Sequence, residues 1–154
     1  KGFFMRDGKR KLALNPKTKS YTPIDELPVP DLSYIDEIAE LHRIGRYEDA
    51  MKAFLAAPGD EAELARKVIA GYIAYSFARV GEATDTITGI DMIMGYGFNW
   101  APPSVLRDLF GQAETVALIQ KHGLTVPKAL ADADPNTNLF NHPNCNIGKF
   151  FVAR

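Results

Sequence analysis

The sequence has a single cysteine, Cys145, so no disulfide can form within the chain. A low cysteine content is compatible with a reducing compartment, and we predict a cytoplasmic protein. Long apolar runs are also missing, because the longest one, residues 68–78, is too short to cross a bilayer and is interrupted by Gly71 and Ser76. The sequence therefore predicts no membrane segment, and it shows no charged and apolar leader that would direct export.

The chain has no overall excess of either charge, since 18 Lys and Arg residues balance 19 Asp and Glu residues. The distribution is uneven, because residues 1–19 carry a net charge of +6 and the remainder carries −7. Such a basic segment can bind the phosphates of nucleic acid or of coenzyme A. No aromatic residue is interleaved between Arg6 and Lys19, so we interpret the segment as a solvated surface and expect no nucleic-acid partner. The charged residues of this segment are Lys1, Arg6, Asp7, Lys9, Arg10, Lys11, Lys17 and Lys19.

The first thirty residues differ in pattern from the rest. Apolar residues at 3–5 and 12–14 flank Asp7 and Gly8, a two-residue turn signal, and predict a small hairpin. Residues 15–30 are rich in Pro, Ser, Thr and Lys, and they predict an extended linker.

A short internal sequence similarity suggests how the chain is divided. KGFF at residues 1–4 resembles GKFF at residues 148–151, about one domain length later. We therefore expect residues 1–30 to comprise the end of a preceding repeat, the hairpin and a linker. Residues 31–154 are expected to form one complete helical domain.

After Pro30, apolar residues recur at helical spacing in segments that end at Gly or Pro. We expect the longest helix to be the buried centre, since residues 68–77 are apolar nearly all round, and we expect Gly71 and Ala74 to let a neighbouring helix approach closely. The fold class predicted is an all-α bundle of five or six helices with a short N-terminal hairpin. The expected helices span about residues 31–44, 46–57, 61–80, 88–97, 103–111 and 113–122, with a further turn within 126–133.

Residues 94–103, MGYGFNWAPP, contain the first two glycines of a dinucleotide-binding loop. The third small residue of that loop is replaced by Trp100, and the preceding residues are spaced as in a helix rather than a buried strand. We therefore interpret the stretch as a packed corner. Gly97 is expected to end one helix in the left-handed conformation, Pro103 to begin the next, and Phe98 and Trp100 to hold the turn on the central helix.

Residues suited to catalysis or metal binding are few. Cys145 follows His142 by three positions in an Asn-rich loop, which without a second pair is a poor metal site and a poor catalytic dyad. His42 and His122 lie near expected helix C-termini, where a histidine interacts favourably with the helix dipole. This interaction is sufficient to explain both residues without a functional role. No P-loop, zinc-finger or nucleophile-elbow pattern appears. We predict no catalytic residue, no bound cofactor and no metal in this chain.

The stretch GIDMIMGYGFNWAPPSVLRDLFG, residues 89–111, resembles the most recognisable motif of the 3-hydroxyacyl-CoA dehydrogenase C-terminal domain family. In that family, Ile-Asp and a helix lead to Gly-Phe-x-Trp, and a Gly-Pro step leads into a helix that ends in Asp-Leu-x-Gly. KGFF and the hairpin after it also resemble the closing motif of one repeat and the start of the next. The matching residues are Ile90, Asp91, Gly97, Phe98, Asn99, Trp100, Pro103, Asp108, Leu109 and Gly111.

The resemblance implies the all-α fold of 6-phosphogluconate dehydrogenase C-terminal-like domains. It also implies a parent enzyme that oxidises 3-hydroxyacyl-CoA to 3-ketoacyl-CoA with NAD in fatty-acid β-oxidation. An upstream nucleotide-binding domain of the parent would bind NAD, acyl-CoA would be the substrate, and a homodimer or a contact between repeats is expected. The implied cleft or interface residues are Phe98, Asn99, Trp100 and Pro103, and the implied structural residues are Asp91, Gly97, Asp108 and Gly111.

The chain departs from the family pattern at several points. Pro102 stands where the family has Gly before Pro, and the family's polar Asn-Glu pair falls on Ala74 and Tyr75. The His-Glu pair that takes the hydroxyl proton in the family has no counterpart here, so we expect the isolated chain to be inactive. A stand-alone helical protein-interaction module is the alternative function, and nucleic-acid binding by residues 1–19 is a third.

Overall fold

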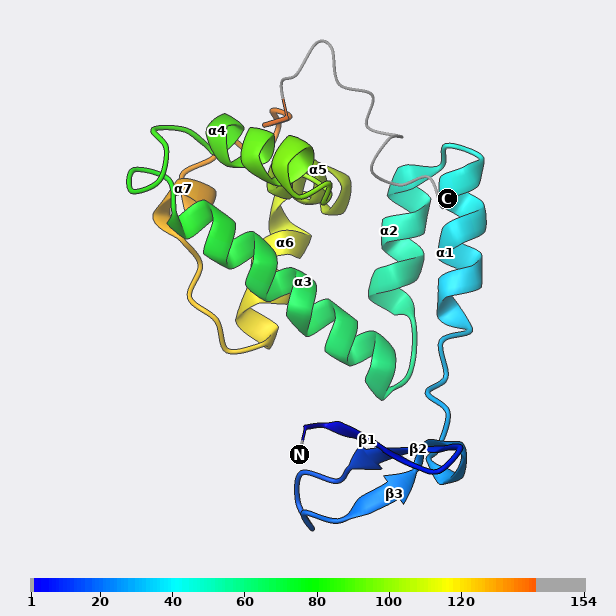
Figure 1. Cartoon of the computed structure of the whole chain (residues 1–154). Helices are drawn as coiled ribbons and strands as arrows, with labels where there is room; N and C mark the ends of the chain where they lie inside the picture. Colours follow the sequence, from blue (N-terminus) through cyan, green and yellow to red (C-terminus); the bar gives the residue numbers. More distant parts are fainter. Residues whose placement is uncertain (1, 141–154) are drawn as a thin grey trace. The chain divides into compact units, whose positions relative to one another are not determined.

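The computed structural model describes residues 2–140, in which most residues lie in helices (Figure 1). The chain divides after Pro30 into two compact units, a small sheet and a larger helical unit. No helix among the described residues is long and apolar enough to cross a membrane. The coarse prediction of a mainly helical domain with a short N-terminal hairpin is thus confirmed, whereas the assignment of the first unit to a preceding repeat stays a prediction.

The first unit is a three-stranded antiparallel sheet, in which β1 (Phe4–Asp7) pairs with β2 (Arg10–Leu14), and β2 pairs with β3 (Tyr21–Pro23). The β1–β2 turn contains Gly8 at φ 57°, a conformation that favours glycine. The prediction of an extended linker from residue 15 is wrong for its middle part, since β3 and the 3-10 helix η1 (Ile24–Glu26) lie there. The sequence signal was weak because β3 has only three residues.

The second unit contains seven α-helices among the described residues. Their boundaries lie within a few residues of those expected, because glycines and prolines end or begin most of them. The exception is the predicted helix 88–97, which is a short α-helix followed by a π-helical turn. The elements are α1 (Tyr34–Arg43), α2 (Tyr47–Ala56), α3 (Asp60–Ala78), α4 (Ile87–Met92), the π-helix η2 (Ile93–Gly97), α5 (Pro103–Phe110), α6 (Gln112–Lys121) and α7 (Lys128–Ala131).

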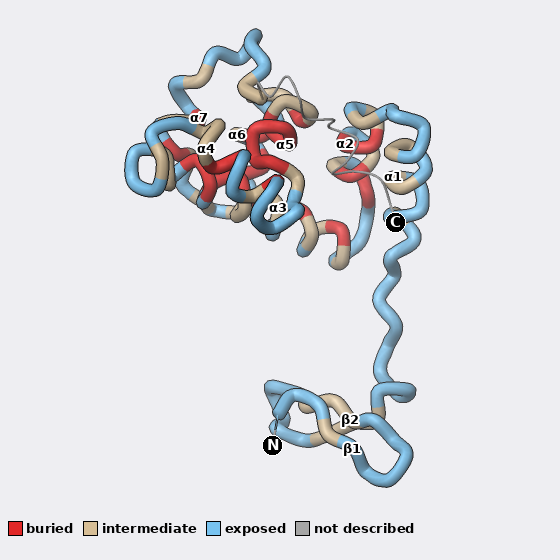
Figure 2. The backbone as a smooth tube through the Cα atoms, turned by 45° about the horizontal axis from the view of Figure 1, so that its top comes forward, coloured by how far each residue is buried: buried red, intermediate tan, exposed pale blue. Residues whose placement is uncertain are grey.

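One face of α3 forms the centre of the core. The buried segments of the helical unit lie mainly on α3, α5 and their neighbours (Figure 2). Ile73 and Phe77 of α3 belong to one cluster with Val105 of α5, Ile119 of α6 and Leu130 of α7. The other face of α3 is exposed, so the prediction that this helix is the buried centre holds for one of its faces only. Bulky apolar residues on every side were interpreted as burial, but the neighbouring helices cover one side of α3 only.

The predicted close helix approach at Gly71 is also wrong. A Cβ atom built at Gly71 would meet no atom within 4 Å, so no described neighbour lies close to this position. Ala74, in contrast, is buried in the core cluster.

Candidate functional site

The corner between α4 and α5 is built around a left-handed residue, which is Asn99 at φ 56° and not Gly97. The prediction of a left-handed Gly97 is therefore wrong. The π-helical turn η2 continues through Gly97, and the positive φ falls two positions later, at Asn99. The Trp100 backbone N–H then donates to the Met94 carbonyl at 3.0 Å and closes the end of the helix. Asparagine tolerates this conformation better than most side chains.

Trp100 and Tyr72 connect this corner to α3. The indole and phenol rings meet edge to face, with their centroids 5.5 Å apart. The Tyr72 hydroxyl donates to the Ala101 carbonyl at 2.8 Å. Burial, and then the charge of Asp91, raise the pKa of Tyr72 well above its ordinary value, so the phenol stays protonated as a donor.

The aromatic residues of the corner remain accessible to solvent. Phe98 is 64% exposed, and Trp100 is still 55% exposed despite its contact with Tyr72. Tyr96 on η2 is also about half exposed. The corner therefore presents an aromatic surface that the described residues do not cover.

Asp91 is a buried carboxylate that caps α5. It accepts hydrogen bonds from the Ser104 backbone N–H at 3.0 Å and from the Ser104 hydroxyl at 2.5 Å. The first N–H groups of a helix lack partners within the helix, and a negative charge is favourable there. Asp91 lies near the end of α4 and binds the start of α5, the next α-helix in the chain. Pro103 occupies the first position of α5, as expected.

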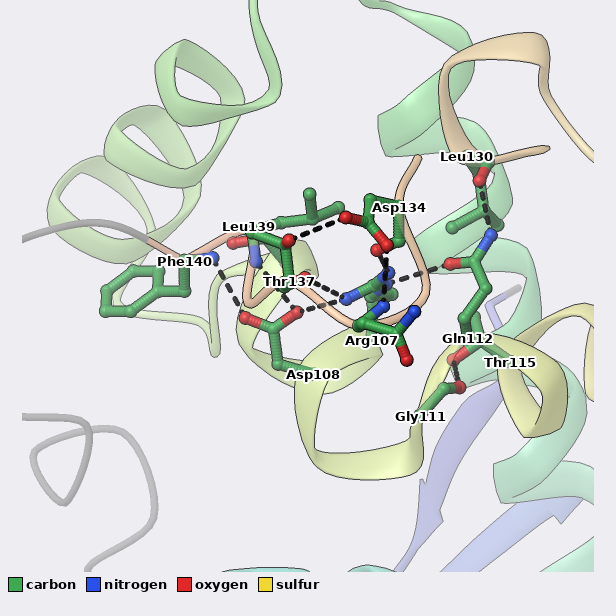
Figure 3. Close-up of polar contacts among 12 residues, drawn as sticks. Arg107, Asp108, Gly111, Gln112, Thr115, Leu130, Asp134, Thr137, Leu139 and Phe140 are labelled. Carbon is green, nitrogen blue, oxygen red and sulfur yellow. Dashed lines mark hydrogen bonds and ion pairs between the residues drawn. The ribbon is translucent and has the colours of Figure 1, made fainter. Parts of the chain in front are cut away.

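Arg107, on α5, is buried and lies at the centre of a polar network (Figure 3). Its Nε donates to Gln112 at 2.8 Å, and its Nη1 donates to Asp108 at 2.9 Å and to the Thr137 carbonyl at 2.8 Å. Its Nη2 donates to the Asp134 carbonyl at 2.6 Å. These bonds satisfy a guanidinium that would otherwise be costly to bury, and they attach residues 134–137 to α5.

Asp108 extends this attachment along the chain. Its two carboxylate oxygens accept the backbone N–H groups of Leu139 and Phe140 at 3.0 and 2.9 Å (Figure 3). Gly111 lies between the end of α5 and the start of α6, and it has φ 86° and ψ 153°. This conformation is essentially restricted to glycine. The Asp-Leu-x-Gly segment therefore has a structural role.

A second buried arginine, Arg66 on α3, was not singled out by the sequence. Its Nη1 donates to the carbonyls of Phe54 and Ala57 at 2.9 and 2.8 Å, and thereby binds the unpaired carbonyls at the end of α2. Glu63 forms ion pairs with Arg66 and with Lys121 of α6. Hydrogen bonds from Lys121 and Arg66 lower the pKa of Glu63 to about 2. The Glu-x-x-Arg spacing was visible, but its burial was not.

A hollow of about 390 Å³ lies at the start of α1, beside the turn between α2 and α3. Among the residues that the structure describes, those lining the hollow include three acids, Asp31, Glu37 and Glu61, and no basic residue. Such a lining repels phosphate groups, so this hollow does not suit coenzyme A.

The described residues contain no group of three or more His, Cys, Asp or Glu side chains that could hold a metal ion. The structure places His42 in the last turn of α1 and His122 directly after α6, both at helix C-termini. The pair His142 and Cys145, and the segment 148–151, lie outside the described residues.

No family model, no curated protein and no solved structure matches the chain. The assignment of a function therefore depends on the corner between α4 and α5 and on the residues that build it.

Proposed function

We propose that this chain is the C-terminal helical domain of an NAD-dependent 3-hydroxyacyl-CoA dehydrogenase. The supporting observation is that the residues of the 89–111 stretch form one corner. Asp91 binds the start of α5, Pro103 begins α5, Asp108 holds the segment after α7, and Gly111 separates α5 from α6. Each of these motif residues thus has a structural role at the start or the end of α5, which supports the proposal better than a similarity of isolated letters would.

In this proposal the chain contributes a surface and no reacting group. The exposed rings of Phe98 and Trp100 suit an apolar wall against the acyl-CoA substrate or against the upstream nucleotide-binding domain. The parent enzyme would oxidise 3-hydroxyacyl-CoA to 3-ketoacyl-CoA in fatty-acid β-oxidation, with NAD bound by that upstream domain. The wall would exclude water and position the acyl group, and a cytoplasmic location fits this role.

The test is to express the complete coding region that contains this chain and to assay NADH formation from 3-hydroxybutyryl-CoA. We expect activity in the complete product and none in the 154-residue chain. A complete product without a nucleotide-binding domain, or NADH formation by the 154-residue chain itself, would contradict the proposal.

Two variants of the active product examine the role of the corner. Phe98→Ala and Trp100→Ala should both raise the KM for acyl-CoA. Phe98→Ala should leave the melting temperature nearly unchanged, whereas Trp100→Ala should lower it because the ring contact with Tyr72 is lost. Phe3→Ala is a matched control, since Phe3 is an exposed phenylalanine of the other unit. Unchanged KM values in both corner variants would show that the corner does not line the substrate cleft.

One observation favours the alternative, a stand-alone helical interaction module. The side of α3 that faces away from the core carries large exposed apolar residues, which is typical of surfaces that bind other proteins. Saturable binding of a protein partner, together with no measurable affinity for acyl-CoA, would favour this module over the enzyme domain.

A further inference from the structure

One face of the small sheet combines cations with apolar side chains. Arg6 on β1 and Lys11 on β2 are register partners, so their side chains lie next to each other on the same face. Phe4 pairs with Ala13, and Ala13 pairs with Thr22 on β3. Because side chains alternate along a strand, these three residues share the face of Arg6 and Lys11. We call this surface of five residues the cationic face.

The acidic residues of this unit lie away from the cationic face. Asp7 and Arg10 are register partners whose side chains point to the opposite face of the sheet. Arg10 forms ion pairs with Asp25 and Glu26 at 3.4 and 2.8 Å. Within residues 2–140, no ion pair neutralises either cation of the cationic face. Like charges directly opposite one another are unfavourable, so an external anion would stabilise this pair of cations.

A hollow of about 410 Å³ lies beside the two cations. It is lined by Phe4, Met5, Arg6, Lys11 and Ile24. Phe4 is 73% exposed and Ile24 is 39% exposed, and apolar surface of this kind is stabilised when it leaves water. The hollow is therefore complementary to a partner that offers both negative charge and an apolar environment.

A second hollow, of about 430 Å³, continues this combination along the sheet. Its lining shares the small residues of the cationic face and adds Lys17 and the exposed Leu27, and no acid lines it among the described residues. Lys9 and Lys19, in the connections before and after β2, add further positive charge to the unit. The cations and the exposed apolar groups thus extend over a surface rather than a single point.

We propose that the cationic face binds the surface of an anionic lipid bilayer. Arg6 and Lys11 pair with headgroup phosphates, and Phe4 and Ile24 enter the boundary between headgroups and acyl chains. Basic side chains are attracted to anionic bilayers, and exposed apolar side chains strengthen this binding by burial at the boundary. The inference depends on the sheet alone and not on the proposed enzymatic function.

The composition of the face favours a bilayer over single-stranded nucleic acid. A nucleic-acid platform presents aromatic rings on which successive bases stack. Phe4 is the one aromatic residue of the cationic face, since Tyr21 pairs with Leu14 and lies on the other face. The other exposed apolar groups beside the cations, Ile24 and Leu27, are aliphatic. Aliphatic groups suit acyl chains better than bases.

Cosedimentation of the 154-residue chain with lipid vesicles tests the proposal. We expect binding to vesicles of equal parts phosphatidylcholine and phosphatidylglycerol, and little binding to pure phosphatidylcholine, because the attraction is electrostatic. Binding should weaken as salt is added. Equal binding to both compositions, or no binding to either, would overturn the proposal. A chain that binds a single-stranded oligonucleotide more tightly than the anionic vesicles would also overturn it.

Charge variants locate the contact on the sheet. Arg6→Gln and Lys11→Gln should each weaken binding to the anionic vesicles ~5-fold. Arg10→Gln removes the same charge from the opposite face, where Asp25 and Glu26 pair with the guanidinium, and should change binding less than ~2-fold. Arg6→Lys keeps the charge and should bind like the wild type. Equal losses in Arg6→Gln and Arg10→Gln would show that binding follows net charge and would reject the cationic face.

A pair of phenylalanine variants tests the apolar part of the contact. Phe4→Ala should weaken vesicle binding ~10-fold, because the ring no longer leaves water on binding. Phe3→Ala is the matched control, since Phe3 is 72% exposed but does not line the hollow, and its effect should be much smaller. Amide NMR spectra verify that the sheet is intact in both variants. A folded Phe4→Ala variant that binds like the wild type would contradict the proposed insertion.

Discussion

Among the described residues of the helical unit, three charged side chains lie buried, and each of them hydrogen-bonds to backbone groups. Arg66 binds carbonyls at the end of α2, Asp91 binds an N–H at the start of α5, and Arg107 binds two carbonyls after α7. Burying a charge is unfavourable unless it is hydrogen-bonded. Each of these residues therefore stabilises the fold only while its hydrogen-bond partners are in place. The motif residues of the corner are thus structural, and the exposed aromatic rings beside them are available for contacts.

Asp91→Asn should lower the free energy of unfolding by about 1–3 kcal/mol, because one carboxylate oxygen that accepts a hydrogen bond from Ser104 is replaced by an amide donor. Urea unfolding monitored by circular dichroism measures the change. Asp85→Asn, at an exposed aspartate before α4, is the control and should change stability by less than about 0.5 kcal/mol. Equal effects of the two substitutions would contradict a capping role for Asp91.

Gly111→Ala should cost about 1–3 kcal/mol of stability, since a Cβ atom is strained at φ 86° and ψ 153° although the space around it is open. Gly97→Ala is the matched control, because Gly97 has no positive φ and a Cβ there would also meet no atom within 4 Å. The control should be neutral or slightly stabilising. A larger loss of stability at Gly97 than at Gly111 would contradict the positive φ assigned to Gly111.

At the scale of elements, α5 organises the second half of the helical unit. Its start is bound by Asp91 from α4, and its last turn binds the segment after α7 through Arg107 and Asp108. Phe110 at its end stacks on Phe54 of α2, with ring centroids 6.2 Å apart. This eight-residue helix therefore connects elements that are distant in sequence.

Arg107→Leu should destabilise the chain by about 3–5 kcal/mol, because the carbonyls of Asp134 and Thr137 and the carboxylate of Asp108 lose a buried partner. Hydrogen exchange of the Leu139 and Phe140 amides should also become faster. Arg43→Leu removes an exposed ion pair with Glu40 and should cost less than about 1 kcal/mol. Unchanged exchange at Leu139 and Phe140 would show that Arg107 does not hold this segment.

Glu63 connects α3 to α6 in a pH-dependent manner. Its pKa falls from 4.5 to about 2 in the folded chain, so its contribution to stability is complete above about pH 4.5 and is lost as the pH falls towards 2. The difference in urea midpoint between the wild type and Glu63→Gln should therefore be largest near neutral pH and should disappear near pH 2. Glu48→Gln, on the exposed side of α2, is the control. A difference that does not change with pH would contradict the ion pairs with Arg66 and Lys121.

At the scale of the whole molecule, the sheet and the helical unit have separate internal contacts. Residues 31–154 alone should keep the helical circular dichroism and the cooperative unfolding of that unit. Residues 1–30 alone should be unfolded, because a three-stranded sheet of this size buries too little apolar surface to be stable by itself. Loss of cooperative unfolding in the 31–154 fragment would show that the sheet is required by the helical unit.

Much of the helical layout follows from local signals. Pro103 and Gly111 delimit α5, and Gly123 follows the end of α6, as helix start and stop rules predict. The candidate corner was also found from sequence, through its Gly, Trp and Pro residues. The π-helical turn, the left-handed Asn99 and strand β3 were missed, because each depends on contacts that short-range periodicity does not contain.

The sequence by itself determined that this chain is mainly helical and where most helices begin and end, because apolar spacing and Gly or Pro positions act over a few residues. Only the tertiary structure decided which polar groups are buried, since Arg66, Asp91 and Arg107 bind backbone groups 9 to 30 residues away. It also decided that one side of α3 is buried and the other exposed. Both sides are apolar, so the difference arises from which neighbours pack against the helix and not from its own composition.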